Sequence, residues 1–192
     1  MQAGHERLLH VIMTDPKDMQ EQGVKLFKQH DYEAAARLFQ QALEAYKAEG
    51  KEDMMAEMQV NIGLVHRALG EHQEALEVMK SALEVFQKLE DPLRAAQVLG
   101  NLGGVYAALK DQEQAYNCYR EAADTFQELG EKDLYGETLL AMGDLQIRDR
   151  KITAGAATYQ VGLEQLENLS GTQKVIKRLS GFINRLTGSG GV

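Results

Sequence analysis

The sequence predicts an all-α protein, built as a right-handed α-solenoid of four helix-turn-helix repeats with a C-terminal capping helix. Three observations lead to this prediction. The composition favours helices, with only two prolines among 192 residues and 6% aromatic residues. Glycine recurs with a fixed spacing of 40 residues, at Gly23, Gly63, Gly103 and Gly143. Small and large residues follow each of these glycines in one register, which is typical of stacked repeats.

Three further positions define this register. Twelve residues after each glycine comes a small residue, at Ala35, Ala75, Ala115 and Gly155. Four residues later comes a large one, at Phe39, Met79, Tyr119 and Tyr159. Three residues beyond it lies a second small one, at Ala42, Ala82, Ala122 and Gly162. Because a single helix pair cannot bury its own apolar stripe, we expect the pairs to stack, with small residues at close helix crossings and the large residue beside them.

Capping residues divide the first half of the chain into two repeats. The first repeat, about residues 15–50, starts at the "TDP" of residues 14–16, where proline's missing N–H costs nothing in the first turn. Its turn is predicted at Asp31, whose carboxylate can accept a hydrogen bond from the first turn of the second helix. Gly50 is expected to end that helix. The second repeat, about residues 51–90, turns at "GEHQEA".

The second half follows the same plan. The third repeat, about residues 91–130, starts at the "EDP" of residues 90–92, turns at Asp111 and stops at Gly130. The fourth, about residues 131–168, turns at "RKITAG". We therefore expect four helix pairs between residues 15 and 168.

The two ends lie outside the repeats. Residues 1–14 include the short amphipathic stretch "ERLLHVIM", which is expected either to pack on the edge of the first repeat or to occupy the groove in place of a ligand. Residues 169–187 form an amphipathic helix that is predicted to cap the last repeat. Its basic face gives the last 25 residues a net charge of +4, so the alternative is docking to an acidic partner or anionic lipid. Residues 188–192, "GSGGV", are expected to be flexible.

The repeats resemble a known family. The segments "NIGLVH", "NLGGVY" and "AMGDLQ", each followed by the small, large and small residues, resemble the tetratricopeptide repeat over about residues 16–168. The usual unit has 34 residues, and the 40-residue unit resembles the long-helix variant of kinesin light chain and of partner-of-Inscuteable-type adaptors. The resemblance implies a non-catalytic adaptor or scaffold that binds an extended peptide of a partner in its concave groove.

Carried over position by position, the resemblance also implies which residues line that groove. They are Asn61, Leu64, Arg67, Gly100, Asn101, Gly104, Ala107, Ala108, Asp144 and Arg148. The amides of Asn61 and Asn101 can donate to and accept from a peptide backbone, although both residues could also be ordinary solvated polar groups. Gly100 and Gly104, with Ala107 and Ala108, predict a side-chain-poor pocket in the groove floor. Arg67 and Arg148 could attract an acidic side chain or simply be solvated.

Other classes of protein are disfavoured. The five histidines have no metal-ligand spacing, Cys118 is expected to be a packed thiol, and no glycine-rich nucleotide motif occurs, so neither an enzyme nor a cofactor is expected. The net charge of −8 disfavours nucleic acid. No apolar run is long enough to span a membrane, and a cytoplasmic location is expected. The alternative function is a structural subunit or assembly factor, a monomer or homodimer, that self-associates or docks on a larger complex, including a membrane-associated one.

Overall fold

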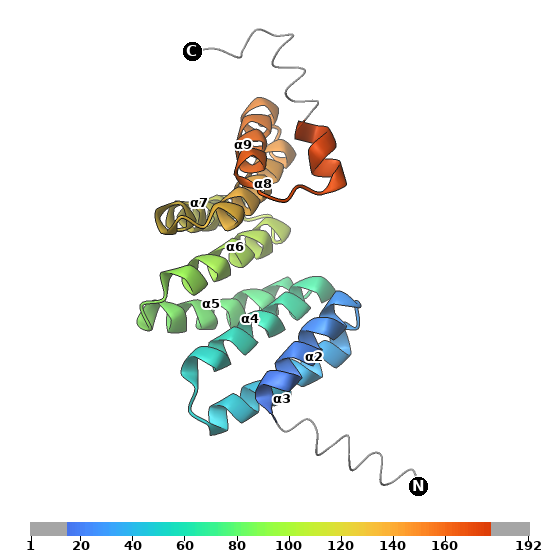
Figure 1. Ribbon diagram of the computed structural model, residues 1–192, viewed down its shortest axis with the longest axis vertical. Helices are drawn as coiled ribbons and strands as arrows, with labels where there is room; N and C mark the ends of the chain where they lie inside the picture. The colour runs from blue at the N-terminus through green and yellow to red at the C-terminus, as the bar shows by residue number, and fades with distance from the viewer. Residues whose placement is uncertain (1–14, 178–192) are drawn as a thin grey trace.

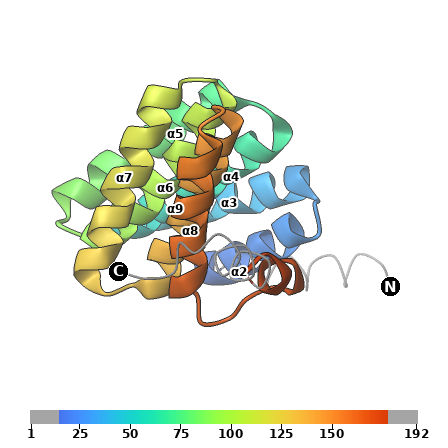
Figure 2. The same ribbon diagram turned by 90° about the horizontal axis from the view of Figure 1, so that it is seen from above.

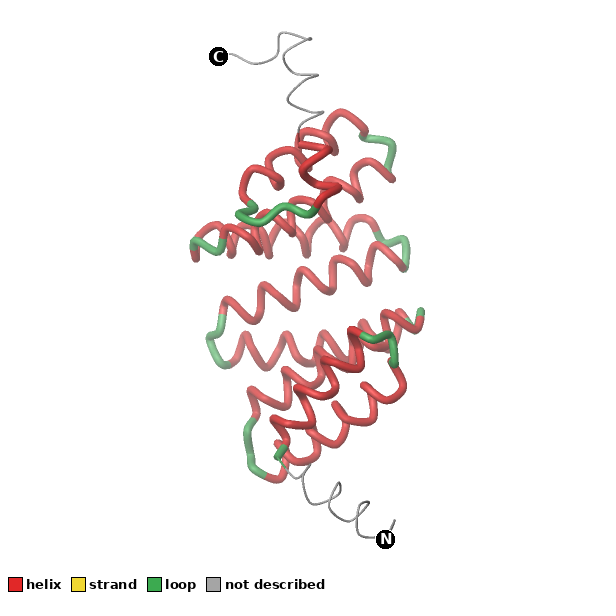
Figure 3. Tube along the Cα trace, turned by 45° about the vertical axis from the view of Figure 1, so that its right-hand side comes forward, coloured by secondary structure: helices red, strands yellow, loops and turns green. Residues whose placement is uncertain are grey.

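The computed structural model describes residues 15–177 (Figure 1). Eight α-helices pack one after another up to Gln165, and residues 15–177 contain no strand (Figure 3). Their bounds are α2 (Pro16–Lys28), α3 (Tyr32–Ala48), α4 (Glu52–Leu69), α5 (His72–Lys88), α6 (Pro92–Ala108), α7 (Gln112–Leu129), α8 (Lys132–Arg148) and α9 (Ile152–Gln165). Every helix contacts the helix before it and the helix after it, and the predicted α-solenoid is confirmed.

The stack is curved, and the odd and even helices lie on different sides of the curve. The even helices α2, α4, α6 and α8 each contact the next even helix, whereas no such contact joins α3 to α5, α5 to α7 or α7 to α9. The even helices therefore lie closer together and form the concave side. Viewed along the long axis, successive pairs point in different directions (Figure 2).

The predicted helix starts are confirmed at the caps. The carboxylates of Asp31, Asp91 and Asp111 accept hydrogen bonds from the backbone N–H three residues later, at 3.2, 2.9 and 3.1 Å. Asp15 accepts from the N–H of Lys17 at 2.9 Å, and a proline follows both Asp15 and Asp91 in the first turn of its helix. These bonds satisfy donors that the helix itself leaves free.

The glycine register brings the two helices of each pair into close contact. A methyl group added at Gly23 would lie 2.6 Å from the ring of Phe39, one at Gly63 would lie 2.6 Å from Met79 Cγ, and one at Gly103 would lie 2.7 Å from the ring of Tyr119. Each glycine thus makes room for the large residue that follows it by sixteen positions, as the register predicts.

The last pair is packed more tightly, backbone against backbone. A methyl group on Gly143 would lie 2.9 Å from the carbonyl oxygen of Gly155, and one on Gly136 would lie 2.8 Å from that of Gly162. Glycine at both small positions of the fourth repeat therefore allows α8 and α9 to approach more closely than a side chain would permit.

The predicted terminal segments fall mostly outside the described residues. These include residues 1–14, the part of the capping helix after Lys177, and the tail 188–192. Residues 171–177 are helical and start with a reciprocal cap, in which the N–H of Ser170 donates to Gln173 Oε1 and the N–H of Gln173 donates to Ser170 Oγ. The ammonium group of Lys177 donates to the carbonyl of Leu163 at 3.0 Å, so this segment lies against α9.

Candidate binding groove

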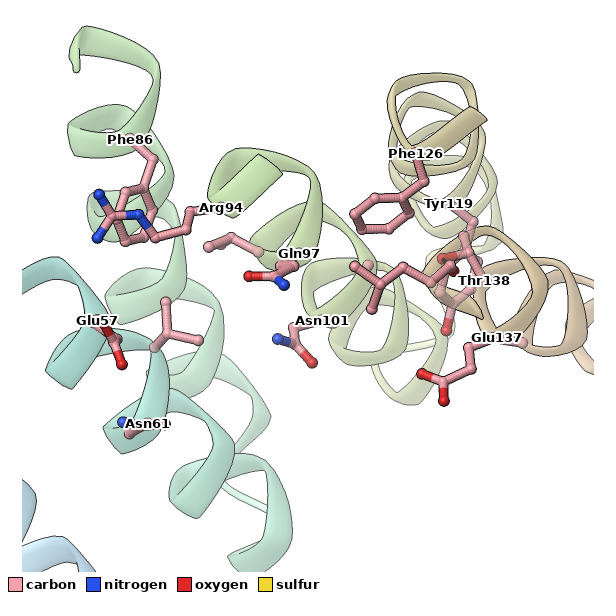
Figure 4. Close-up of a pocket in the computed structure, with 15 residues that line it drawn as sticks. Glu57, Asn61, Phe86, Arg94, Gln97, Asn101, Tyr119, Phe126, Glu137 and Thr138 are labelled. Carbon is pink, nitrogen blue, oxygen red and sulfur yellow. Dashed lines mark hydrogen bonds between the residues drawn. The ribbon is translucent and has the colours of Figure 1, made fainter. Parts of the chain in front are cut away.

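A hollow of about 530 Å³ lies on the concave side, between α4, α6 and α8 (Figure 4). Its floor includes aromatic side chains from the outer helices, and its rim carries polar groups from the inner ones. The lining residues are Glu57, Val60, Asn61, Phe86, Arg94, Gln97, Val98, Gly100, Asn101, Tyr119, Phe126, Leu134, Glu137, Thr138 and Ala141. The hollow is large enough for side chains and a stretch of extended backbone.

Asn61 and Asn101 occupy the same register on neighbouring inner helices, and both line the hollow. Both are half-buried, and within residues 15–177 neither amide takes part in a hydrogen bond. Figure 4 shows Asn61 on α4 and Asn101 on α6, with Glu137 of α8 beyond them. The two amides are therefore available to pair with a ligand that runs across the groove.

A further polar residue of the hollow, Arg94 at the start of α6, is already bound to side chains of the protein itself. The guanidinium group of Arg94 bonds Asp91 at 2.6 Å and Asp53 of α4 at 3.3 Å, and it lies 4.8 Å from the ring centroid of Phe86. It thereby joins α4, α5 and α6. Burial acts to raise the pKa of Asp91, but the hydrogen bonds and charge of Arg94 outweigh it, so the pKa is lowered and the carboxylate stays ionised.

Three residues that line the hollow were not among the predicted groove residues. Glu57, Gln97 and Glu137 lie 40 residues apart, one helical turn before the asparagine register, and all three line the hollow. The Glu57 carboxylate accepts a hydrogen bond from Gln20 of α2. The side chain of Glu137 is exposed and has no ion-pair partner among the described residues. The same 40-residue register, applied one turn earlier, is the signal that could have identified them.

Seven of the predicted groove residues do not line this hollow. Leu64 packs against the central hydrophobic core, and Ala107 packs against the buried cluster of Ala115, Tyr119 and Leu145. Ala108 is exposed near the end of α6. The remaining four are Arg67, Gly104, Asp144 and Arg148.

At Gly104 the predicted side-chain-poor pocket is occupied by a side chain from the neighbouring inner helix. A methyl group there would lie 2.8 Å from Nη1 of Arg67, so this guanidinium group covers the glycine. Ala107 is likewise covered, by the cluster described above. Gly100 is open by contrast, since a methyl group there would meet no described atom within 4 Å outside its own stretch of helix.

Arg67 and the hydroxyl of Tyr119 lie together beside Gly104, and the charges of Asp144 and Arg148 also act on this phenol. Burial raises the pKa of Tyr119, and the charges of Arg67 and Arg148 partly offset this rise, whereas Asp144 adds to it. Arg67 is half-buried, and the other two charged residues are exposed. The charges of both arginines therefore act on the Tyr119 hydroxyl. This part of the groove lies toward the C-terminal ends of α4 and α8.

The described part of the chain offers no arrangement for metal chemistry, because residues 15–177 hold no group of three or more His, Cys, Asp or Glu side chains that could bind a metal ion. Burial raises the pKa of the Cys118 thiol to about 11, so this cysteine is protonated at neutral pH and is a poor nucleophile. Among the described helices, none is both long enough and apolar enough to cross a bilayer.

Comparison with known proteins agrees with the repeat geometry. Residues 54–128 match the tetratricopeptide repeat family. This segment contains the two central helix pairs and most of the hollow. Tetratricopeptide repeats mediate protein–protein interactions and are typically non-catalytic, which is the coarse functional assignment that the match supports.

Solved structures agree on the fold, and 97 chains match. One is BtubC (BKLC) from P. vanneervenii, with a TM-score of 0.72 and 18% sequence identity over 90% of this chain and 72% of that chain. At this identity the likeness concerns the fold alone. No curated protein matches the sequence.

Proposed function

We propose that this protein is a non-catalytic adaptor that binds an extended segment of a partner protein in the concave groove. The observation that carries the proposal is the pair of unbonded, half-buried amides of Asn61 and Asn101 at the rim of a hollow of about 530 Å³. An amide that has no partner in the protein can bond the N–H and C=O groups of a bound backbone. Such bonding gives affinity without strong dependence on the ligand's side chains.

The charge distribution supports a protein ligand over a nucleic acid. The chain has a net charge of −8, and Glu57 and Glu137 place two carboxylates on the hollow itself. A phosphate backbone would be repelled there. We also propose a cytoplasmic location, because a single cysteine fits a reducing compartment.

We infer further that the repeats are of the long-helix kind found in kinesin light chain and in partner-of-Inscuteable-type adaptors. The 40-residue period supports this inference, as do the six central helices, α3–α8, which have 17 or 18 residues each. Longer inner helices provide a deeper groove wall, since each residue adds about 1.5 Å.

The test is to select peptide ligands from a random display library on the intact chain and to measure their affinity by fluorescence polarisation. Asn61→Ala with Asn101→Ala removes both amides, and binding should weaken about tenfold or more because two backbone hydrogen bonds are lost. Circular dichroism should show unchanged helix content, since neither amide bonds another described residue.

Asn117→Ala is the matched control. This exposed asparagine of α7 lies outside the hollow and accepts a hydrogen bond from Arg120, so its loss should leave peptide affinity unchanged. Equal binding by the wild-type chain and the Asn61/Asn101 double variant would contradict the proposal. A stable dimer in light scattering, with a groove indifferent to mutation, would instead support the structural-subunit alternative.

A further inference from the structure

Tyr119 belongs to the outer helix α7, but its hydroxyl reaches the concave side of the protein. Its ring lies across Gly103 of α6, where an added methyl group would be 2.7 Å from ring carbons. Its hydroxyl emerges beside Gly104, 3.5 Å from the position of a methyl group added there. Two adjacent glycines in α6 therefore let an outer-helix phenol pass the inner helix and line the hollow.

The guanidinium group of Arg67 lies at the same place. Its Nη1 is 2.8 Å from the methyl position of residue 104, so the guanidinium group and the Tyr119 hydroxyl border one point on the groove surface. Arg148 acts on the same hydroxyl from α8. Among residues 15–177, neither arginine has an ion-pair partner within 4.0 Å and the Tyr119 hydroxyl has no hydrogen bond.

The three donors come from three different helices: Arg67 and Tyr119 meet beside Gly104, and the exposed Arg148 acts on the phenol through its charge. Two guanidinium groups and a phenol hydroxyl match the acceptor oxygens of a carboxylate, which accepts several charge-assisted hydrogen bonds at once. One opposing charge, the exposed Asp144, faces the same phenol and reduces the positive potential without cancelling that of two arginines. The other acidic residues of the groove, Glu57 and Glu137, line the hollow on the side toward the N-terminal ends of α4 and α8.

We infer that Arg67, Tyr119 and Arg148 form a subsite for the carboxylate of an acidic side chain of the bound peptide. The inference rests on the proposed function, since it places the acid within the same groove. Asn61 and Arg67 are six residues apart on α4, which corresponds to about 9 Å along the helix.

The first experiment tests the subsite without a peptide. The intact chain, labelled with ¹⁵N-arginine, is titrated with acetylglutamate amide and separately with inorganic phosphate, at constant ionic strength. We expect the Nε–Hε signals of Arg67 and Arg148 to shift saturably with the glutamate derivative, while the signal of the exposed Arg37 on α3 stays unchanged. A non-saturable shift shared by all arginines would overturn the inference, and so would saturation by phosphate alone, because the proposed ligand is a carboxylate.

Variants then separate the contributions. Arg67→Met and Tyr119→Phe should each weaken glutamate binding about threefold to tenfold, since each removes one hydrogen bond to a charged group. Asp144→Asn should strengthen binding by removing the opposing charge. Tyr159→Phe is the matched control, because this tyrosine has the same register in α9 and its pKa is raised by burial and by Asp144, without an effect of either arginine. Equal affinity in wild-type, Arg67→Met and Tyr119→Phe would contradict the assignment.

The second experiment distinguishes this subsite from the groove as a whole. In each peptide selected on the wild-type chain, every acidic residue is changed in turn to its amide. One such change should weaken binding about tenfold to the wild-type chain and less than twofold to the Arg67→Met/Arg148→Met variant. Peptides that depend on Asn61 and Asn101 but respond equally in both chains would refute the subsite and leave the proposed function standing. If the glutamate derivative still binds but no peptide depends on Asn61 and Asn101, the subsite would stand and the proposed function would be refuted.

Discussion

Gly100, Gly103 and Gly104 lie within one turn of α6, yet each has a different neighbour. A side chain at Gly103 would collide with the ring of Tyr119, and one at Gly104 would meet the guanidinium group of Arg67. A side chain at Gly100 would meet nothing within 4 Å among residues 15–177. The same residue type is therefore a packing requirement at one position and an open stretch of groove floor at another.

This difference gives a prediction on stability. Gly100→Ala should raise the free energy of unfolding by about 0.5–1 kcal/mol, because alanine favours the helix and its methyl group has room. Gly103→Ala should lower it by about 1–3 kcal/mol, because the methyl group would lie 2.7 Å from an aromatic ring that is itself packed in the core. Urea unfolding followed by circular dichroism measures both. If both variants change the free energy of unfolding equally and with the same sign, the close contact at Gly103 does not exclude a methyl group.

The sequence predicts the packing role of Gly103 but not the neighbour of Gly104. Gly103 follows from the period alone, because the position recurs in every repeat opposite a large residue. Gly104 does not, because its neighbour Arg67 comes from the preceding repeat through a long, flexible side chain. A repeat period fixes which backbone positions face each other, but it does not determine where an arginine places its guanidinium group.

Among the elements, the short turns between helices share one backbone feature, and it occurs at glycine and non-glycine residues alike. Every turn between helix pairs, and every turn within one, places a residue at positive φ. Gly50, Gly70 and Gly130 occupy three of these positions, with φ of 69°, 83° and 76°. The others hold non-glycine residues, at His30, Glu90, Lys110 and Arg150. A side chain disfavours the left-handed conformation, but backbone hydrogen bonds hold it in each turn, as where the N–H of Asp111 donates to the carbonyl of Tyr106 at 2.9 Å.

Lys110→Gly should therefore stabilise the protein by up to about 1 kcal/mol, because Lys110 has φ 65° and glycine adopts this conformation without steric strain. Leu109→Gly, one residue earlier, is the control and should destabilise, since Leu109 has φ −73° and glycine there only adds disorder to the unfolded chain. Thermal unfolding of both variants measures the difference. A lower melting temperature for Lys110→Gly would mean that the lysine makes compensating contacts.

The elements as a whole were more predictable than the side chains of the groove. The Asp and Pro caps give the helix starts because they act locally, through bonds to the next turn. The groove depends on side chains that meet across three repeats, as Glu57, Gln97 and Glu137 do on the rim of the hollow. Local signals do not report such meetings, and only the 40-residue register could have suggested them.

At the scale of the whole molecule, the helices between residues 16 and 165 make no contacts between distant repeats. Pairs of described helices touch only their neighbours or, on the concave side, the next inner helix. Stability is then a sum of local terms and of the interfaces between adjacent units. A ligand that spans α4, α6 and α8 would therefore connect α4 to α8, which do not touch in the described part of the chain, and it should stiffen the array as it binds.

This architecture predicts that damage at one end stays at that end. Phe39 is 1% exposed on α3 and packs on Gly23, so Phe39→Ala should remove about 3–5 kcal/mol of local stability. Hydrogen exchange should accelerate in α2 and α3 while α8 and α9 keep their protection, because neither α2 nor α3 touches α8 or α9. Tyr159→Ala, at the same register in α9, should give the mirror-image pattern. Uniform loss of protection along the chain in both variants would show instead that the array unfolds as one cooperative unit.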